Sequence, residues 1–78
     1  MHVVKNFLAY RERISTLNDV LQIKFVKALE KELSTPNFVD LMVNNTIESS
    51  YFQDNETQII MRFVNDAGEF ITLYSIIL

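Results

Sequence analysis

The sequence predicts a small α+β domain in which two or three N-terminal helices pack on a C-terminal three-stranded antiparallel β-meander. Two observations predict this fold class. Apolar residues recur at helical spacing over residues 1–45, whereas over 46–78 they alternate or run together in short, β-rich blocks. A chain of 78 residues suits one domain. We therefore expect a single α+β domain over 1–78, with a helical part at 1–45 and a meander at 46–78.

The first two helical segments are expected at His2–Ile14 and at about Leu17–Leu33. Thr16 is a suitable N-cap for the second, and Asp19 favours the positive end of that helix. Each segment carries an apolar stripe at the spacing of one helix face. The stripes consist of Val3, Val4, Phe7 and Leu8 in the first segment, and of Leu17, Leu21, Phe25, Ala28, Leu29 and Leu33 in the second.

A third, short helix is expected after the stretch STPNF at residues 34–38. Thr35 can cap it, and Pro36 suits the first helical position, where a missing N–H costs nothing. Asn44 and Asn45 are expected to end it, since asparagine tolerates the left-handed conformation at a helix C-terminus.

Three strands are expected at Thr46–Phe52, Thr57–Asn65 and Glu69–Ile77. Their connections, QDNE and NDAGE, hold the polar and glycine residues that turns require. The second connection fits a type I turn in which Gly68 supplies the positive φ of a bulge.

This turn gives an expected register for the last two strands. It places Val64 opposite Phe70, Met61 opposite Leu73, and Ile60 opposite Tyr74. One face of the sheet would then pack on the helices. That face would carry Ile59, Met61, Phe63, Ile71, Leu73 and Ile77, joined by Ile47 and Tyr51 of the first strand.

The second face of the expected sheet is also apolar, which is unusual for an antiparallel sheet with helices on one side. It would carry Ile60, Val64, Phe70, Tyr74 and Ile76, interrupted by Arg62 and Thr72. A patch of this kind marks an interaction surface if it stays exposed. Three arrangements are open: a helix or the N-terminal segment folds over the face, a homodimer forms through it, or another protein binds it.

The residue types needed for most catalytic and metal sites are scarce. The chain has no Cys, one His at position 2 and one Gly. These counts exclude a disulfide, a thiolate metal site, a P-loop and a dinucleotide fingerprint, and they leave no convincing Ser-His-Asp set. The acidic residues of the two loops are expected to be solvated turn residues. We therefore expect a protein that is not an enzyme and that has no cofactor, no metal and no small-molecule substrate.

Charge is divided unevenly along the chain. Residues 1–34 hold six basic and four acidic residues, net +2, whereas residues 35–78 hold one basic and six acidic, net −5. Lys24, Lys27 and Lys31 could form a basic helix face for nucleic acid. The net charge of −3 argues against that function, and the same spacing is typical of a solvated helix face.

No stretch reaches the roughly 20 apolar residues of a membrane span, and the final FITLYSIIL is less than half that length. An integral membrane protein is therefore not expected, nor is a secretory signal at the N-terminus. The lack of Cys is compatible with a cytoplasmic location. Amino acids with AT-rich codons are abundant, which suggests an AT-rich genome such as that of a low-GC bacterium, a bacteriophage or another mobile element.

These observations favour binding over catalysis. The hypothesis is a cytoplasmic, phage-encoded regulatory or inhibitory adaptor, a small non-enzymatic module that binds another protein through the second sheet face. The alternatives are a homodimer or larger structural homo-oligomer, and a nucleic-acid binder that uses the lysine face. The expected partner-binding residues are Ile60, Arg62, Val64, Phe70, Tyr74 and Ile76.

Overall fold

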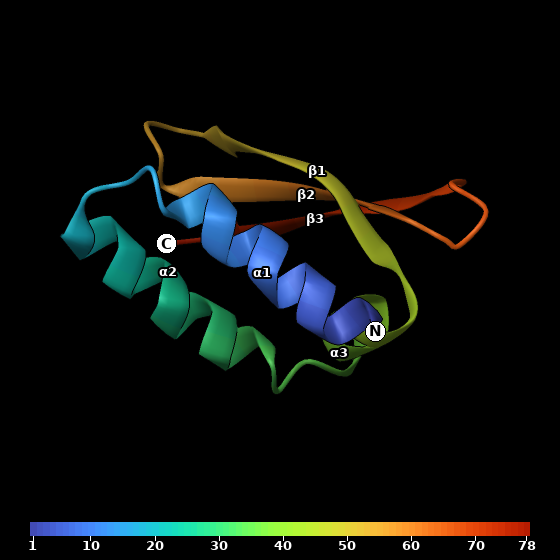
Figure 1. The fold of residues 1–78 in the computed structure, drawn as a ribbon. Helices are drawn as coiled ribbons and strands as arrows, with labels where there is room; N and C mark the ends of the chain where they lie inside the picture. Colours follow the sequence, from blue (N-terminus) through green and yellow to red (C-terminus); the bar gives the residue numbers. More distant parts are fainter.

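The computed structural model describes residues 1–78 as three helices followed by a three-stranded antiparallel sheet (Figure 1). The elements are α1 (His2–Ile14), α2 (Asp19–Glu32), α3 (Pro36–Asn44), β1 (Thr46–Gln53), β2 (Gln58–Val64) and β3 (Phe70–Ile77). The strands follow the order β1-β2-β3, so the sheet is a meander. The expected α+β class is confirmed.

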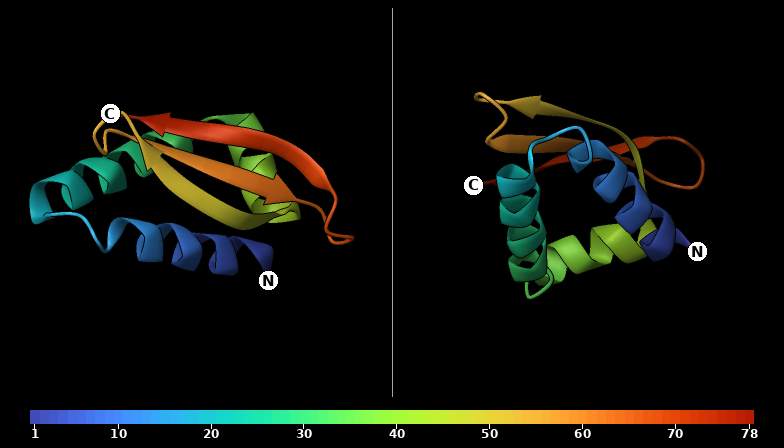
Figure 2. Two further views of the ribbon diagram at one scale, coloured as in Figure 1. Left: turned by 90° about the horizontal axis from the view of Figure 1, so that it is seen from above. Right: turned by 60° about the vertical axis from the view of Figure 1, so that its left-hand side comes forward.

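All three helices lie on one side of the sheet, and no element covers the other side (Figure 2). Helix α1 packs beneath β1, α2 packs beneath β3, and α3 contacts both α1 and the start of the sheet. The arrangement in which a helix or the N-terminal segment folds over the second face is therefore wrong.

The first connection differs from expectation at the start of α2. Asn18, not Thr16, is the N-cap, and its side chain accepts a hydrogen bond from the Leu21 N–H at 2.9 Å. The reason is that the chain continues to turn beyond α1. The Leu17 N–H donates to the Ile14 carbonyl at 3.0 Å, so the extended N-cap conformation is reached only at residue 18.

Helix α3 begins with Pro36 in its first turn, as expected. Thr35 occupies the N-cap position, but its side chain makes no capping hydrogen bond. At the other end Asn45 is extended, with φ −129° and ψ 177°, so the expected left-handed conformation there is wrong. The chain enters β1 at the next residue, and an extended Asn45 leads directly into the strand.

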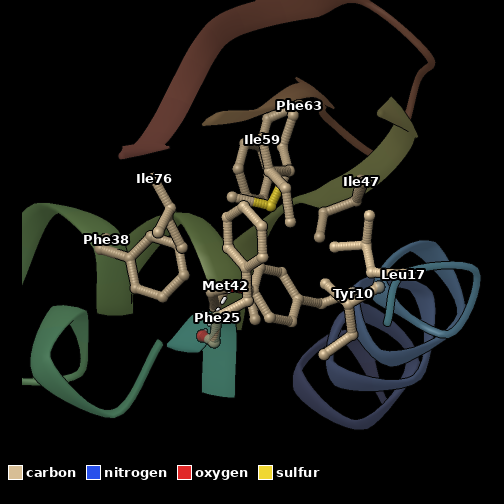
Figure 3. Close-up of a cluster of buried hydrophobic side chains, with 11 residues drawn as sticks. Tyr10, Leu17, Phe25, Phe38, Met42, Ile47, Ile59, Phe63 and Ile76 are labelled. Atoms are coloured by element: carbon tan, nitrogen blue, oxygen red, sulfur yellow. Dashed lines mark hydrogen bonds between the residues drawn. The ribbon is translucent and has the colours of Figure 1, made fainter. Parts of the chain in front are cut away.

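The core is a cluster of buried apolar side chains between the two layers (Figure 3). It consists of Tyr10, Ile14, Leu17, Phe25, Phe38, Met42, Ile47, Ile59, Met61, Phe63 and Ile76. The buried side of α1 is the face of Asn6, Tyr10 and Ile14, so Val4 and Leu8 of the expected stripe are exposed. Asn6 and Tyr10 thus determine which face of α1 is buried, and the polar atoms of both side chains are hydrogen-bonded there.

Asn6 is completely buried and joins three elements. Its Nδ2 donates to the carbonyls of Met42 at 2.9 Å and Asn45 at 2.7 Å, and its Oδ1 accepts from the Ile47 N–H at 2.8 Å. These backbone groups belong to the end of α3 and the start of β1. One amide therefore satisfies the polar groups where the chain passes from the helical layer into the sheet.

Tyr10 in the core and Tyr74 beside it bond across elements. The Tyr10 hydroxyl donates to the Phe25 carbonyl at 2.9 Å, and the Tyr74 hydroxyl donates to the Glu32 carboxylate. Burial raises the pKa of the Tyr10 phenol. Burial, together with the hydrogen bond and negative charge of Glu32, raises the pKa of Tyr74 to about 12.

The β2–β3 turn forms as expected, but the register beyond it does not. Val64 pairs with Phe70, as the turn predicts. A bulge at Ile71 then shifts the pairing by one residue, so Met61 lies opposite Tyr74 and not Leu73. Because side chains alternate along a strand, this shift moves every later side chain of β3 to the face of the sheet opposite to the expected one.

The bulge turns Thr72, Tyr74 and Ile76 toward the helices. Leu73 and Ile77, which were expected to face the helices, instead lie on the opposite face. Ile60 consequently lies opposite Ser75 and not Tyr74. Ile71, also expected to face the helices, is the extra residue of the bulge and is exposed.

A second bulge in β1 has the same effect. Ile47 pairs with Phe63, but the register shifts at Glu48, and Phe52 pairs with Ile59. Phe52 therefore faces the core. Tyr51, expected beside Ile47, lies on the opposite face.

The two hairpin connections differ in backbone strain. Gly68 takes the positive φ of the β2–β3 turn at 78°, as expected. In the β1–β2 loop the three consecutive residues Asp54, Asn55 and Glu56 have φ of 52°, 54° and 64°. Left-handed conformations are unfavourable for residues other than glycine, and least so for Asp and Asn. Glu56 is therefore the most strained position of the loop.

Replacing Asn6 should destabilise the fold strongly. Asn6→Ala leaves three buried backbone groups without partners, and we expect the free energy of unfolding to fall by about 3 kcal/mol or more in urea titrations. The exposed Asn44, which bonds only to Asp40, provides the matched control. Asn44→Ala should change stability by less than about 1 kcal/mol. Equal losses in the two variants would contradict the role assigned to Asn6.

Glu56→Gly should stabilise the protein, because glycine adopts a positive φ without steric cost. We expect a gain of about 0.5 kcal/mol and a rise in Tm of about 3 °C, measured by thermal unfolding. The neighbouring strand residue Gln53 does not have a positive φ. Gln53→Gly should therefore lower Tm, and a fall in both variants would argue against strain at residue 56.

Stability should fall as the pH rises between about 10 and 12. The Tyr74 phenol keeps its proton in the folded state up to a pKa of about 12, whereas the unfolded phenol loses it near 10. The contribution of Tyr74 is thus complete below pH 10 and is lost as the pH rises through 12. Denaturant unfolding over this range should show a shallower decline in Tyr74→Phe. An identical decline in the two proteins would exclude Tyr74 as its source.

Candidate partner-binding face of the sheet

The face of the sheet turned away from the helices carries a continuous set of large side chains from all three strands. The two bulges and the strand alternation bring them together. We call this set the outer face. It consists of Tyr51 from β1, Ile60, Arg62 and Val64 from β2, and Phe70, Leu73 and Ile77 from β3.

The outer face has a buried floor and an exposed rim. Ile60 and Val64 on the central strand are only 8% and 7% exposed, because the side chains of both neighbouring strands flank them. Tyr51, Leu73 and Ile77 on the edge strands are 44%, 49% and 67% exposed. A partner would therefore contact the edge-strand side chains first, and Ile60 and Val64 little.

Arg62 is the only cation of the outer face. Its guanidinium lies 4.9 Å from the centre of the Phe70 ring and forms an ion pair with Glu48. Both charges are partly exposed, so the pair adds little to stability. Its effect is to hold the long Arg62 side chain between Glu48 of β1 and Phe70 of β3, with its charge balanced.

Four of the six residues expected to bind a partner lie on this face: Ile60, Arg62, Val64 and Phe70. The expected position of the other two is wrong. Tyr74 packs against Phe38 with ring centres 4.8 Å apart, and Ile76 is fully buried in the core. The bulge at Ile71 is the physical reason, since it moves both side chains to the helix side.

The expected set also omits Tyr51, Leu73 and Ile77. For β1 the sequence holds a usable signal. Ile47 is in the core and Phe52 packs against it. They are separated by five positions, and an odd separation within one strand requires an extra residue if both side chains face the same side. For β3 there is no such signal, because both alternate sets of its residues are apolar and either could face the core.

The sheet layer is strongly acidic. Residues 46–78 hold five acidic residues and one basic residue, net −4, whereas residues 1–45 hold five acidic and six basic residues, net +1. The acidic side chains lie near both ends of β3. Asp66 and Glu69 come from the turn that precedes it, and Asp54 and Glu56 from the loop beside its other end, where the Leu78 N–H bonds to the Thr57 carbonyl.

Two other surface features lie outside the outer face: the lysines of α2 and the acidic side chains of the loops. Lys24, Lys27 and Lys31 of α2 are exposed, with Glu30 on the same helix. No group of three or more His, Cys, Asp or Glu side chains is arranged to hold a metal ion. The aspartate and glutamate of the β2–β3 turn are instead bonded within the chain, Asp66 to His2 at 2.6 Å and Glu69 to Asn65 at 3.0 Å.

None of the helices has the length and apolar character needed to cross a membrane. Comparison with known proteins gives no relative for this chain: no protein-family model, no curated protein and no solved structure matches it.

Proposed function

We propose that this protein is a non-enzymatic binding module that attaches to another protein through the outer face. The observation that carries the proposal is the exposure of large apolar side chains, among them Phe70, Leu73 and Ile77, on a sheet face that no helix covers. Aromatic side chains and arginine are the usual anchors of protein interfaces. Phe70 and Arg62, whose guanidinium lies over the Phe70 ring, supply both.

The size of the face suits a reversible association. Three strands of about eight residues cover roughly 27 by 14 Å, or about 400 Å² in projection. A standard interface buries about 800 Å² on each partner. The outer face alone would therefore give a small interface, which suits a regulatory or inhibitory adaptor that binds and releases its target.

Charge favours a basic partner over a second copy of this chain. Two sheet layers, each of net charge −4, would repel each other if their outer faces stacked. A target with lysine or arginine around an apolar patch would complement both the rim and the acidic loops. We place this activity in the cytoplasm and attribute the gene to a bacteriophage, on the basis of the missing cysteines and the abundance of residues with AT-rich codons.

A target can be trapped by a photo-crosslinking amino acid placed at Phe70 and then purified for binding measurements. Leu73→Asp and Tyr51→Asp place a charge on opposite edges of the outer face, and each should weaken binding at least about 30-fold in calorimetry. The matched control is Ile23→Asp, at an exposed apolar residue of α2. This variant should bind like the unmodified protein.

The reverse pattern would contradict the proposal: a complex weakened by Ile23→Asp and insensitive to both outer-face substitutions. Light scattering of the unmodified protein adds an independent test. We expect a monomer up to high micromolar concentration. A dimer that Leu73→Asp dissociates would show that the outer face binds its own copy and not another protein.

A further inference from the structure

The two edges of the sheet differ in how their backbone is protected. Edge strands expose unpaired N–H and C=O groups, and proteins usually block them with charges, proline, bulges or covering elements. Strand β1 has a bulge at Glu48, and the outward N–H of Ile47 is bonded to Asn6. Arg13 also donates to the Ser50 hydroxyl at 2.8 Å and lies 5.9 Å from the Phe52 ring centre. Helix α1 thus binds part of the β1 edge, at the Ile47 N–H and at the Ser50 side chain.

Strand β3 also has a bulge, at Ile71, but beyond the bulge its edge carries no charged side chain and no proline. Residues 70–78 contain no charge, no proline and no glycine. The Leu78 N–H bonds to the β2 side of the sheet, at the Thr57 carbonyl. Because backbone groups of alternate residues point to opposite sides of a strand, those of Leu73, Ser75 and Ile77 point away from β2. The only side chain bonded to them is Thr72, whose hydroxyl donates to the Leu73 carbonyl at 3.0 Å.

A hollow opens beside this edge, between β3 and α3. It is lined by Asn37, Asp40 and Leu41 of α3 and by Thr72 and Tyr74 of β3. The Asp40 carboxylate is exposed and accepts a hydrogen bond from the Asn44 side chain at 2.8 Å. A side chain entering here would meet the apolar surfaces of Leu41 and Tyr74 and the Asp40 carboxylate, which suits the aliphatic stem and cationic head of lysine or arginine.

From these features we infer that β3 is a docking edge to which an extended segment of another protein adds as a fourth strand. The incoming segment alternates apolar side chains, which extend the outer face beside Leu73 and Ile77, with side chains on the helix side that include a lysine or arginine near Asp40. This inference rests on the proposed function and specifies how the partner is held. The added strand would also enlarge the interface beyond the small outer face.

A second copy of β3 is a poorer occupant of the same edge. Antiparallel pairing of two β3 strands would place Glu69 of one copy near the acidic β1–β2 loop of the other. Like charges placed together in this way weaken association. A segment with basic residues at its ends meets opposite charge at both ends of β3.

The test uses a synthetic peptide in which valine alternates with lysine or threonine, KVTVKVTVK. We expect it to bind the unmodified protein and to slow amide hydrogen exchange at Leu73, Ser75 and Ile77. A peptide with glutamate in place of lysine should bind at least about tenfold more weakly. N-methylation of the two central valines, whose N–H groups would pair with β3, should abolish binding. N-methylation of the threonines, whose N–H groups point away, should not.

Ser75→Pro provides the matching change in the protein. It removes one outward N–H and leaves the bonds to β2 in place, a position at which edge strands accept proline. We expect loss of peptide binding with the fold retained, and Ser75→Ala should bind normally. If Ser75→Pro fails to fold, the N-methylated peptides still decide the question on the unmodified protein.

The inference is overturned if the peptide does not protect the three amides, if the glutamate peptide binds equally well, or if both N-methylated peptides bind alike. Each of these results would leave the proposed function standing, provided that Leu73→Asp and Tyr51→Asp still weaken the trapped target. Conversely, the peptide could add at β3 while Tyr51→Asp leaves binding of the trapped target unchanged. That result would confine target binding to the β3 edge and exclude the outer face.

Discussion

The side-chain amide of Asn6 is the interaction on which the arrangement of the two layers depends. It lies in an otherwise apolar interior and bonds three backbone groups at the junction of α3 and β1. Buried backbone groups need partners, and no helix or sheet ladder reaches these three. Satisfying them fixes the rotation of α1, which then packs against the β1 edge. The face of α1 that is buried and the bond between α1 and the β1 edge both follow from this one residue.

The two β-bulges determine what the sheet presents to each side. Both lie near Phe63 of the central strand, one at Glu48 in β1 and one at Ile71 in β3. Each re-aims the remainder of its strand, so that Phe52 and Tyr74 enter the core while Tyr51 and Leu73 leave it. A regular sheet with the same sequence would direct a different set of side chains outward. The apolar outer face is thus a product of two single-residue irregularities, which families of β proteins retain as specific features and not as defects.

Most of the fold could be predicted from periodicity and turn chemistry. The helix at His2–Ile14, the restart at Pro36 and the glycine turn at residue 68 are all local signals, and all three are observed. What could not be predicted depends on contacts between distant residues. The exposure of Leu8 follows from hydrogen bonds that Asn6 makes roughly 40 residues away along the chain.

The candidate site could be predicted only in part for the same reason. Central-strand residues keep their alternation, so Ile60 and Val64 lie on the expected face. The edge strands do not keep their alternation. A bulge forms in a strand according to which of its two alternate sets of side chains fills the core better. In β3 the two sets are nearly equal in apolar character. Only packing against Phe38 and the polar partner offered by Glu32 distinguish them and favour Tyr74 inside.

The contrast between the two hairpin connections has a consequence for the order of folding. The β2–β3 turn is built from residues that suit its conformation, with Gly68 at the positive φ and the Asn65 side chain accepting from the Ala67 and Glu69 N–H groups. The β1–β2 loop places three residues other than glycine in the left-handed region and is held in that shape by the finished structure. The β2–β3 hairpin is therefore favoured to form first, and β1 joins it together with α1. Before the helices dock, the uncharged β3 strand is exposed on both faces, which makes this half-formed state the one most at risk of aggregation.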